Sequence, residues 1–309
     1  MLVDVADLDC VYLSYDEPQK EEFWVQIQNI VPWAKRVDGV QGSDAAHKAA
    51  AAISDTERFI LIDGDNIPDS NFFDIQLDIK AEYTDCVFRW KARNHINGLM
   101  YGNGGLSCWT KTFVNNMRTH EASDGSSDTA VEFCFDNKYI AMHNVYSTTY
   151  PNGSEYHAWR AGFREGVKLC LAKGEKPTPD NFDEIVNKQN IQNLLIWMSV
   201  GADVENGLWA ILGAREGCHK ITHTDWDFVD VRDFKWLNKF WQEQAYESID
   251  NNTLLEKINH YGNQLKHTLE LDITLLNEEA SAFFKKQMKR ENTFKLMTTE
   301  NEVYRRMND

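Results

Sequence analysis

The sequence of 309 residues contains six cysteines, but none forms a CxxC pair or a zinc-like spacing. The cysteines at positions 10, 86 and 134 lie among apolar neighbours, so we expect buried thiols rather than disulfide bridges. No apolar run approaches 18 residues, and the first residues lack a basic segment followed by an apolar one. We therefore expect neither a membrane span nor a signal peptide, and a soluble, cytoplasmic protein.

Several phosphate- and metal-binding motifs are also missing. The sequence has no P-loop and no GxGxxG after a strand, so neither ATP hydrolysis nor NAD binding is supported. It has no EF-hand either, because the oxygen ligands and the glycine do not recur at the needed positions.

Basic residues are scarce relative to acidic ones, at 32 Lys and Arg against 48 Asp and Glu, which gives a net charge of −16. This acidity excludes a protein whose whole surface coats nucleic acid. Residues 285–309 nevertheless carry seven basic and four acidic side chains. This basic tail is either a solvated helix face or a local contact for phosphates.

Apolar residues make up 42% of the chain, which excludes disorder, and their spacing predicts two halves. The first half alternates strands and helices, which predicts an α/β fold whose first strands are parallel and covered by helices on both faces. After residue 80 the pattern becomes mixed, so we expect a mixed sheet flanked by helices. Its expected elements are strands at 9–14, 34–40 and 58–62, helices at 20–30 and 43–52, and later strands at 86–91, 99–101 and 139–146. Beyond a boundary near residue 155 we expect helices at 156–171, 181–200, 234–245 and 253–290.

The clearest chemical motif is Asp63-Gly64-Asp65, which directly follows the apolar strand at 58–62. Ligand sites of α/β sheets lie at the carboxyl ends of the strands, and two carboxylates there suit a divalent cation that also contacts phosphate. A strand-end turn is the structural alternative.

The polar segment Ser14-Tyr15-Asp16-Glu17 ends the first strand and is expected at the same edge. Tyr15 could stack on a base, and Asp16 or Glu17 could accept a hydrogen bond from a ribose or base.

The order of these segments resembles nucleotide-sugar glycosyltransferases of the GT-A fold, with family-2-type enzymes most similar. The resemblance covers about residues 8 to 165 and rests mainly on Phe59-Ile60-Leu61-Ile62-Asp63-Gly64-Asp65-Asn66. The family's four landmarks are a DxD metal motif, a glycine-rich loop, an acidic motif at a helix start and a late histidine. Their counterparts here are Asp63 with Asp65, Gly102-Asn103-Gly104-Gly105, Ser127-Asp128, and His143 or His157.

The resemblance implies a Rossmann-like GT-A domain at 1–155, and a helical region at 156–309 that completes the site and contacts the acceptor. Asp65 would bind Mn²⁺ or Mg²⁺, and Asp63 would contact the metal or the ribose. The helix with His47 and Lys48 would lie beside the nucleotide, and Gly104 and Gly105 would allow the donor sugar to approach. Asp128 would be the catalytic base, although the family usually has Glu-Asp where this chain has Ser127-Asp128. A helix N-cap is the alternative for Asp128.

His157, Arg160 and Arg164 fall on one face of a predicted helix. An imidazole that binds metal beside two guanidiniums would stabilise a departing diphosphate. A purely structural histidine is the alternative, and His143 is the second candidate for the third metal ligand.

These observations predict a metal-dependent glycosyltransferase that moves a sugar from a nucleoside diphosphate donor, such as a UDP-sugar, to a hydroxyl acceptor. Two segments, Leu13 to Pro18 and Trp159 to Arg164, are similar to segments of glycosyltransferases encoded by large DNA phages. This similarity implies hydroxymethylcytosine in DNA as an acceptor, modified in the host cytoplasm. A polysaccharide or protein acceptor and a non-catalytic sugar-nucleotide-binding module are the alternatives. A dehalogenase-type phosphatase is disfavoured because its aspartates normally follow the first strand. The stereochemical outcome and the oligomeric state stay open.

Overall fold

The computed structural model describes residues 1–101, 105–117, 138–172, 175–295 and 304–306. Backbone contacts separate the chain into two compact units, and the division falls between Tyr150 and Pro151. The sequence predicted a boundary near residue 155, and the roles predicted for the two halves stay predictions. No helix in the described ranges has both the length and the apolar character needed to cross a membrane.

The first unit is built on a mixed β-sheet with strand order β10-β9-β7-β8-β4-β2-β3, in which β5 also pairs with β9. Strands β3, β2 and β4 are parallel, and β8 is antiparallel to β4. The strands of this sheet are β2 (Asp9–Ser14), β3 (Lys35–Asp38), β4 (Arg58–Asp63), β5 (Asn66–Pro68), β7 (Val87–Asn94), β8 (Leu106–Thr110), β9 (Tyr139–Thr149) and β10 (Tyr304–Arg306). A separate pair is formed by β1 (Leu2–Asp4) and β6 (Gln76–Asp78).

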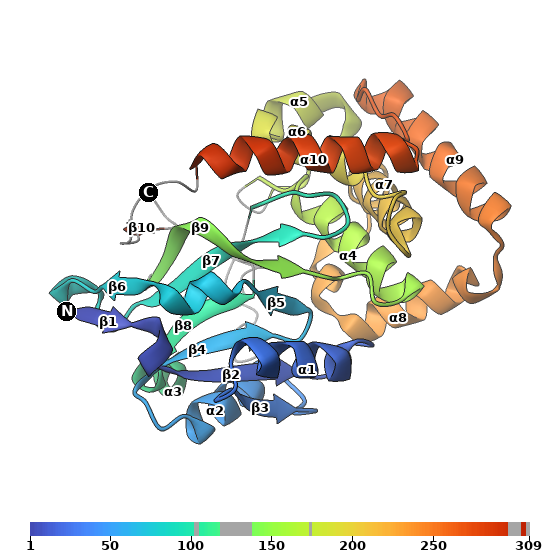
Figure 1. Ribbon diagram of the computed structural model, residues 1–309. Helices are drawn as coiled ribbons and strands as arrows, with labels where there is room; N and C mark the ends of the chain where they lie inside the picture. The colour runs from blue at the N-terminus through green and yellow to red at the C-terminus, as the bar shows by residue number, and fades with distance from the viewer. Residues whose placement is uncertain (102–104, 118–137, 173–174, 296–303, 307–309) are drawn as a thin grey trace. The chain divides into compact units, whose positions relative to one another are not determined.

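Helices cover both faces of this sheet. Successive residues of a strand point to opposite faces, so neighbouring residues of β2 contribute to two different cores. On β2, Tyr12 packs in one core with Phe23 and Ile27 of α1 (Lys20–Ile30). Its neighbour Val11 packs in the other core with Ala50 of α2 (Ser43–Ile53), and α3 (Lys111–Asn116) lies on the same side (Figure 1). The predicted α/β class with a mixed, helix-covered sheet is therefore confirmed.

The register of the parallel strands brings their carboxyl ends to one edge of the sheet. Ser14 at the end of β2 pairs with Asp38 at the end of β3. On its other side, Leu13 of β2 pairs with Asp63, the last residue of β4. Polar residues that end three separate strands are thus neighbours.

The second unit is helical. Its helices are α4 (Glu155–Lys168), α5 (Phe182–Ile185), α6 (Lys188–Trp197), α7 (Gly207–His223), α8 (Phe234–Glu243), α9 (Asn251–Leu269) and the first part of α10 (Glu278–Lys295). Short 3₁₀ turns of the chain are η1 (Val5–Asp7), η2 (Ser70–Asp74), η3 (Ala81–Tyr83), η5 (Pro179–Asn181), η6 (Phe228–Arg232) and η7 (Tyr246–Ser248).

Helices α4 and α7 are in close backbone contact because glycines on each helix face the other. A Cβ on Gly162 would overlap the carbonyl of Ala210, and a Cβ on Gly213 would overlap the carbonyl of Trp159. Trp159 itself is fully buried. These glycines therefore set the separation of the two helices at the centre of the unit.

Three expectations about elements are wrong, and one long helix was not predicted. Residues 99–101 are not a strand, because a turn that begins at Asn94, with Gly98 at φ +78°, precedes them, and the next strand begins at Leu106. The single helix expected at 253–290 is two helices, interrupted after Glu270 at φ +54°. The helix expected at 181–200 is broken near Asn187, whose side chain caps α6. Helix α7 was not predicted. Cys10 and Cys86 are buried as predicted, and Cys134 lies outside the described residues.

Candidate functional site

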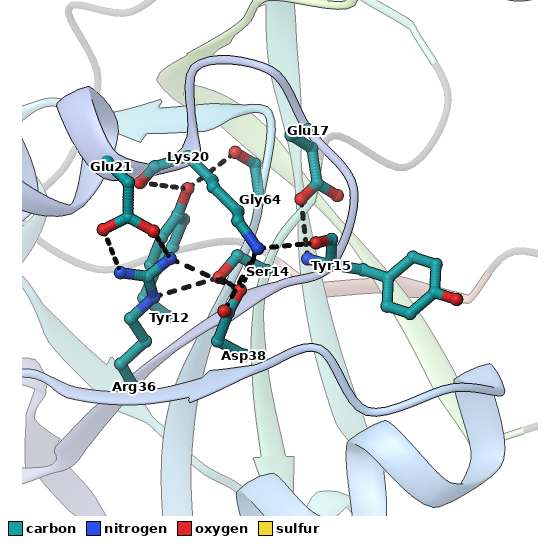
Figure 2. Close-up of polar contacts among 9 residues, drawn as sticks. All are labelled: Tyr12, Ser14, Tyr15, Glu17, Lys20, Glu21, Arg36, Asp38 and Gly64. Carbon is teal, nitrogen blue, oxygen red and sulfur yellow. Dashed lines mark hydrogen bonds and ion pairs between the residues drawn. The ribbon is translucent and has the colours of Figure 1, made fainter.

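Three carboxylates from two strand ends meet at the edge of the sheet. Asp63 ends β4, Asp65 follows two residues later, and Glu17 follows the end of β2. The carboxyl group of Glu17 lies directly against Gly64, where a Cβ would overlap it. The hydroxyl of Tyr12 donates a hydrogen bond of 2.8 Å to the Gly64 carbonyl (Figure 2). The turn between the two aspartates is thus held by residues on and directly after β2.

The electrostatics of this edge disfavour full ionisation. Burial raises the pKa of Asp63 to about 7, and repulsion from Asp65 and Glu17 adds to the effect, while Arg89 opposes it. Burial also raises the pKa of Glu17, and the charge of Asp65 contributes. Like charges held close together in a partly desolvated place are stabilised by a cation. The edge is therefore a place of unbalanced negative charge.

Gly105 and Thr149 make further contacts with the two aspartates. The backbone N–H of Asp63 donates to the Gly105 carbonyl at 2.8 Å, and Thr149 Oγ1 donates to Asp65 Oδ2 at 3.0 Å. Gly105 has φ +73°, and a Cβ there would lie 3.0 Å from Asp63 Oδ2. The contact therefore favours glycine at position 105 for both space and backbone conformation.

Asn66 adds a buried polar group next to these carboxylates. Its side chain is fully buried, and its amide nitrogen would lie 3.3 Å from a Cβ at Gly105. Within the described ranges, neither its amide nitrogen nor its amide oxygen has a hydrogen-bond partner. A buried amide of this kind is costly unless a ligand, a water molecule or another part of the chain satisfies it.

A network of side chains fixes the neighbouring strand ends (Figure 2). Ser14 Oγ donates to Asp38 at 2.7 Å, and Lys20 Nζ pairs with the same carboxylate at 2.8 Å while also donating to the Tyr15 carbonyl. Arg36 binds Glu21 through two bonds of 2.7 Å and reaches Asp38 at 3.3 Å. The Tyr15 ring itself is 46% exposed, so it is accessible for stacking. Asp16, beside it, is also exposed.

The helix residues predicted beside a nucleotide have local structural roles. His47 Nδ1 donates a hydrogen bond of 2.8 Å to the Ser43 carbonyl, and its ring packs edge-on against Trp109. Lys48 pairs with Asp44 at 2.6 Å, one helical turn away. Their predicted contact with a nucleotide stays a prediction.

The predicted helix face with the late histidine lies in the second unit, on α4. Ser154 caps this helix, and its Oγ lies 2.7 Å from His157 Nδ1, so a metal would have to bind through Nε2. Arg160 and Arg164 both lie over the ring of Phe234. The alternative, His143, is an exposed residue of β9 in the first unit. Neither histidine is shown to be a metal ligand.

Parts of two predicted landmarks fall outside the described ranges, namely Gly102, Asn103 and Gly104 of the glycine-rich loop and Ser127 with the proposed base Asp128. Most of the basic tail after residue 295 does so as well, while Lys285 forms an ion pair of 2.7 Å with Asp203.

The described residues hold no group of three or more His, Cys, Asp or Glu side chains spaced to bind one metal ion. A metal site of two carboxylates is compatible with this finding, since Mg²⁺ in phosphate sites is commonly held by one or two carboxylates together with substrate phosphates. The oxygen donors of Asp63 and Asp65 are of the type that Mg²⁺ and Mn²⁺ prefer.

Sequence reasoning missed three residues of this edge, namely Asp38, Asn66 and Arg89. Asp38 carries a usable signal, because it ends a short strand directly before Gly39, in the same way as Asp63 precedes Gly64. Asn66 directly follows the aspartates, but nothing in the sequence indicates that its amide is buried. Arg89 lies within β7, and only the sheet brings it near Asp63.

No family model matches the sequence, and no curated protein matches it significantly.

Proposed function

We propose that this protein is a metal-dependent glycosyltransferase that takes a nucleoside diphosphate sugar at the carboxyl edge of β2, β3 and β4. The observation that carries the proposal is the meeting of Glu17, Asp63 and Asp65 from two strand ends, with the pKa of Asp63 raised to about 7. A divalent cation would relieve this repulsion and would bring the phosphates of the donor to the edge.

The neighbouring residues suit the nucleoside. The exposed ring of Tyr15 offers a stacking face, and Asp38, held by Ser14 and Lys20, places an acceptor beside it. Bound Mn²⁺ or Mg²⁺, held by Asp65 with Asp63, would supply charge stabilisation for the departing diphosphate. The GT-A topology and the role of Asp128 as base belong to the same proposal.

The acceptor is a hydroxyl group, and we propose hydroxymethylcytosine in DNA as the first acceptor to test. Transfer to a polysaccharide or protein would be the alternative outcome. In either case a base must take the proton of the attacking hydroxyl as the bond to the sugar forms.

The test combines binding with turnover. Titration calorimetry with UDP should show binding with MnCl₂ that weakens at least about tenfold with EDTA or in Asp65→Asn. Asp180→Asn, a carboxylate of the second unit, is the matched control and should bind as the unchanged protein does. A screen of nucleotide sugars against hydroxymethylated oligonucleotides, read by mass spectrometry of nucleosides, then tests transfer. UDP binding that is equally tight with MnCl₂, with EDTA and in Asp65→Asn would contradict the metal site, and binding without hydrolysis or transfer of any donor would favour a non-catalytic module.

A further inference from the structure

A second cluster of charged and aromatic side chains lies on the helical unit, between α4 and α8. The guanidinium carbons of Arg160 and Arg164 lie 4.6 Å and 5.1 Å from the centroid of the same ring, Phe234. Arg160 also lies 5.4 Å from the centroid of Tyr156. The two arginines are one helical turn apart, so α4 and the ring of α8 hold two positive charges side by side.

The surroundings of Arg164 leave its positive charge poorly compensated. Its pKa is lowered by burial first and by the charge of Arg160 second. Glu165 opposes this shift, but the carboxylate of Glu165 already pairs with Lys168 at 2.8 Å. Within the described ranges, the buried Nε of Arg164 has no hydrogen-bond partner. Two neighbouring guanidiniums with a buried donor between helices are the features of an anion site.

The ring of Phe234 adds a second chemistry. It is 48% exposed although it belongs to the first turn of α8, so one part of it contacts the arginines and another part faces solvent. Exposed aromatic rings beside guanidiniums stack on bases, and the guanidiniums bind the phosphates that the bases carry.

We infer that Arg160, Arg164 and Phe234 form a binding site for a phosphate group that carries a planar base, that is, for a nucleotide. The site takes either a free nucleoside diphosphate or a phosphodiester of nucleic acid, which share this chemistry. The inference adds Phe234 and a base to the diphosphate contact predicted for the arginines, and it needs no metal at the sheet edge.

The experiment measures nucleotide binding in EDTA, where metal-dependent binding at Asp63 and Asp65 is absent. The three probes are UDP by calorimetry, a labelled oligothymidylate by fluorescence anisotropy, and tripolyphosphate, which has no base. Arg160→Gln and Arg164→Gln should each weaken the binding of UDP or of oligothymidylate about tenfold. For the oligonucleotide, the slope of log affinity against log salt concentration should fall by the amount expected for about one phosphate contact. Phe234→Ala should weaken the same nucleotide probe but leave tripolyphosphate unchanged.

The control is Lys239→Gln, which removes one positive charge from an exposed position of the same α8 helix. If the variants lose affinity for UDP alone, the site binds a free nucleotide. If they lose affinity for the oligonucleotide alone, the site binds nucleic acid. The inference is overturned if all three variants bind both nucleotides within twofold of the unchanged protein, or if Lys239→Gln weakens binding equally. If circular dichroism shows that Arg164→Gln does not fold, Arg160→Gln and Phe234→Ala decide. Asp65→Asn should bind normally in EDTA, so failure here is distinct from failure of the proposed transferase site.

Discussion

The carboxyl group of Glu17 lies against the backbone of Gly64, in the space that a side chain at position 64 would need. The same carboxyl accepts the backbone N–H of Tyr15 at 2.7 Å. Because Gly64 lies between Asp63 and Asp65, this contact adds a third carboxylate to the motif from a separate strand end.

Gly64→Ala should therefore damage the site more than the fold. The new Cβ meets the end of a flexible side chain, so Glu17 can move aside at a cost in unfolding free energy of about 1 kcal/mol or less. Binding of UDP with Mn²⁺ should fall, because Glu17 no longer lies beside the aspartates. Calorimetry and urea unfolding measure the two effects. Glu17→Ala combined with Gly64→Ala is the control, and the two binding losses should be less than additive. Full additivity would show that the contact carries no function.

The raised pKa of Asp63 gives a pH dependence of stability. Between about pH 4 and pH 7 the folded protein holds a proton that the unfolded chain has released, because the pKa rises from 3.8 to about 7 on folding. The free energy of unfolding should therefore fall as the pH rises through this window. Urea unfolding from pH 5 to pH 8 should show a flatter profile for Asp63→Asn. Mn²⁺ at pH 7.5 should restore stability to the unchanged protein but less to the variant. Equal slopes in both proteins would refute the assignment.

The sequence was informative about this edge because short apolar strands end directly in carboxylates. Asp63, Asp65 and Glu17 could be placed together from the rule that parallel strands end at one edge, and the register confirms that β2 and β4 are adjacent. Arg89 could not be placed in this way. Its strand β7 is separated from β4 by β8, a strand that the sequence did not predict, so its distance from Asp63 depends on long-range pairing.

Helix α7 was missed for a related reason. Its glycines, among them Gly213 and Gly217, lower the local helix propensity, and a sequence pattern counts them as breakers. In the structure they lie against the backbone of α4, where larger residues would not fit. Tertiary packing therefore outweighs the local preference, and packing of this kind is not visible before the partner helix is known.

This packing predicts a large effect of Gly213→Ala. The added Cβ would overlap the backbone around Trp159 and Phe163, which cannot move as a side-chain end can. We expect a loss of about 3 kcal/mol in the free energy of unfolding, as for overpacked cores. Gly39→Ala is the comparison, because Gly39 has φ +71° but nothing within 4 Å of the new Cβ, so only backbone strain of about 1 kcal/mol applies. Thermal unfolding of both variants measures the difference, and equal losses would contradict the close helix contact.

Glu216 offers a test of the core of the helical unit. This buried carboxylate of α7 accepts hydrogen bonds from Trp159 Nε1 at 2.8 Å and from the hydroxyls of Tyr246 and Tyr261 at 2.8 Å and 3.1 Å. Burial raises its pKa, and these donors partly offset the shift. Glu216→Leu would leave three donors without an acceptor and should cost about 3 kcal/mol or more.

Glu216→Gln separates the hydrogen bonds from the charge. The amide keeps one acceptor oxygen, so the loss in urea unfolding at pH 7 should be well below that of Glu216→Leu. The variant should also lose part of the pH dependence, because the raised pKa of Glu216 makes the folded unit less stable as the pH rises above the ordinary carboxylate range. Equal unfolding free energies for Glu216→Leu and Glu216→Gln would mean that the three donors find other partners. The Glu216 carboxylate would then not be the group that links α4, η7 and α9 to α7.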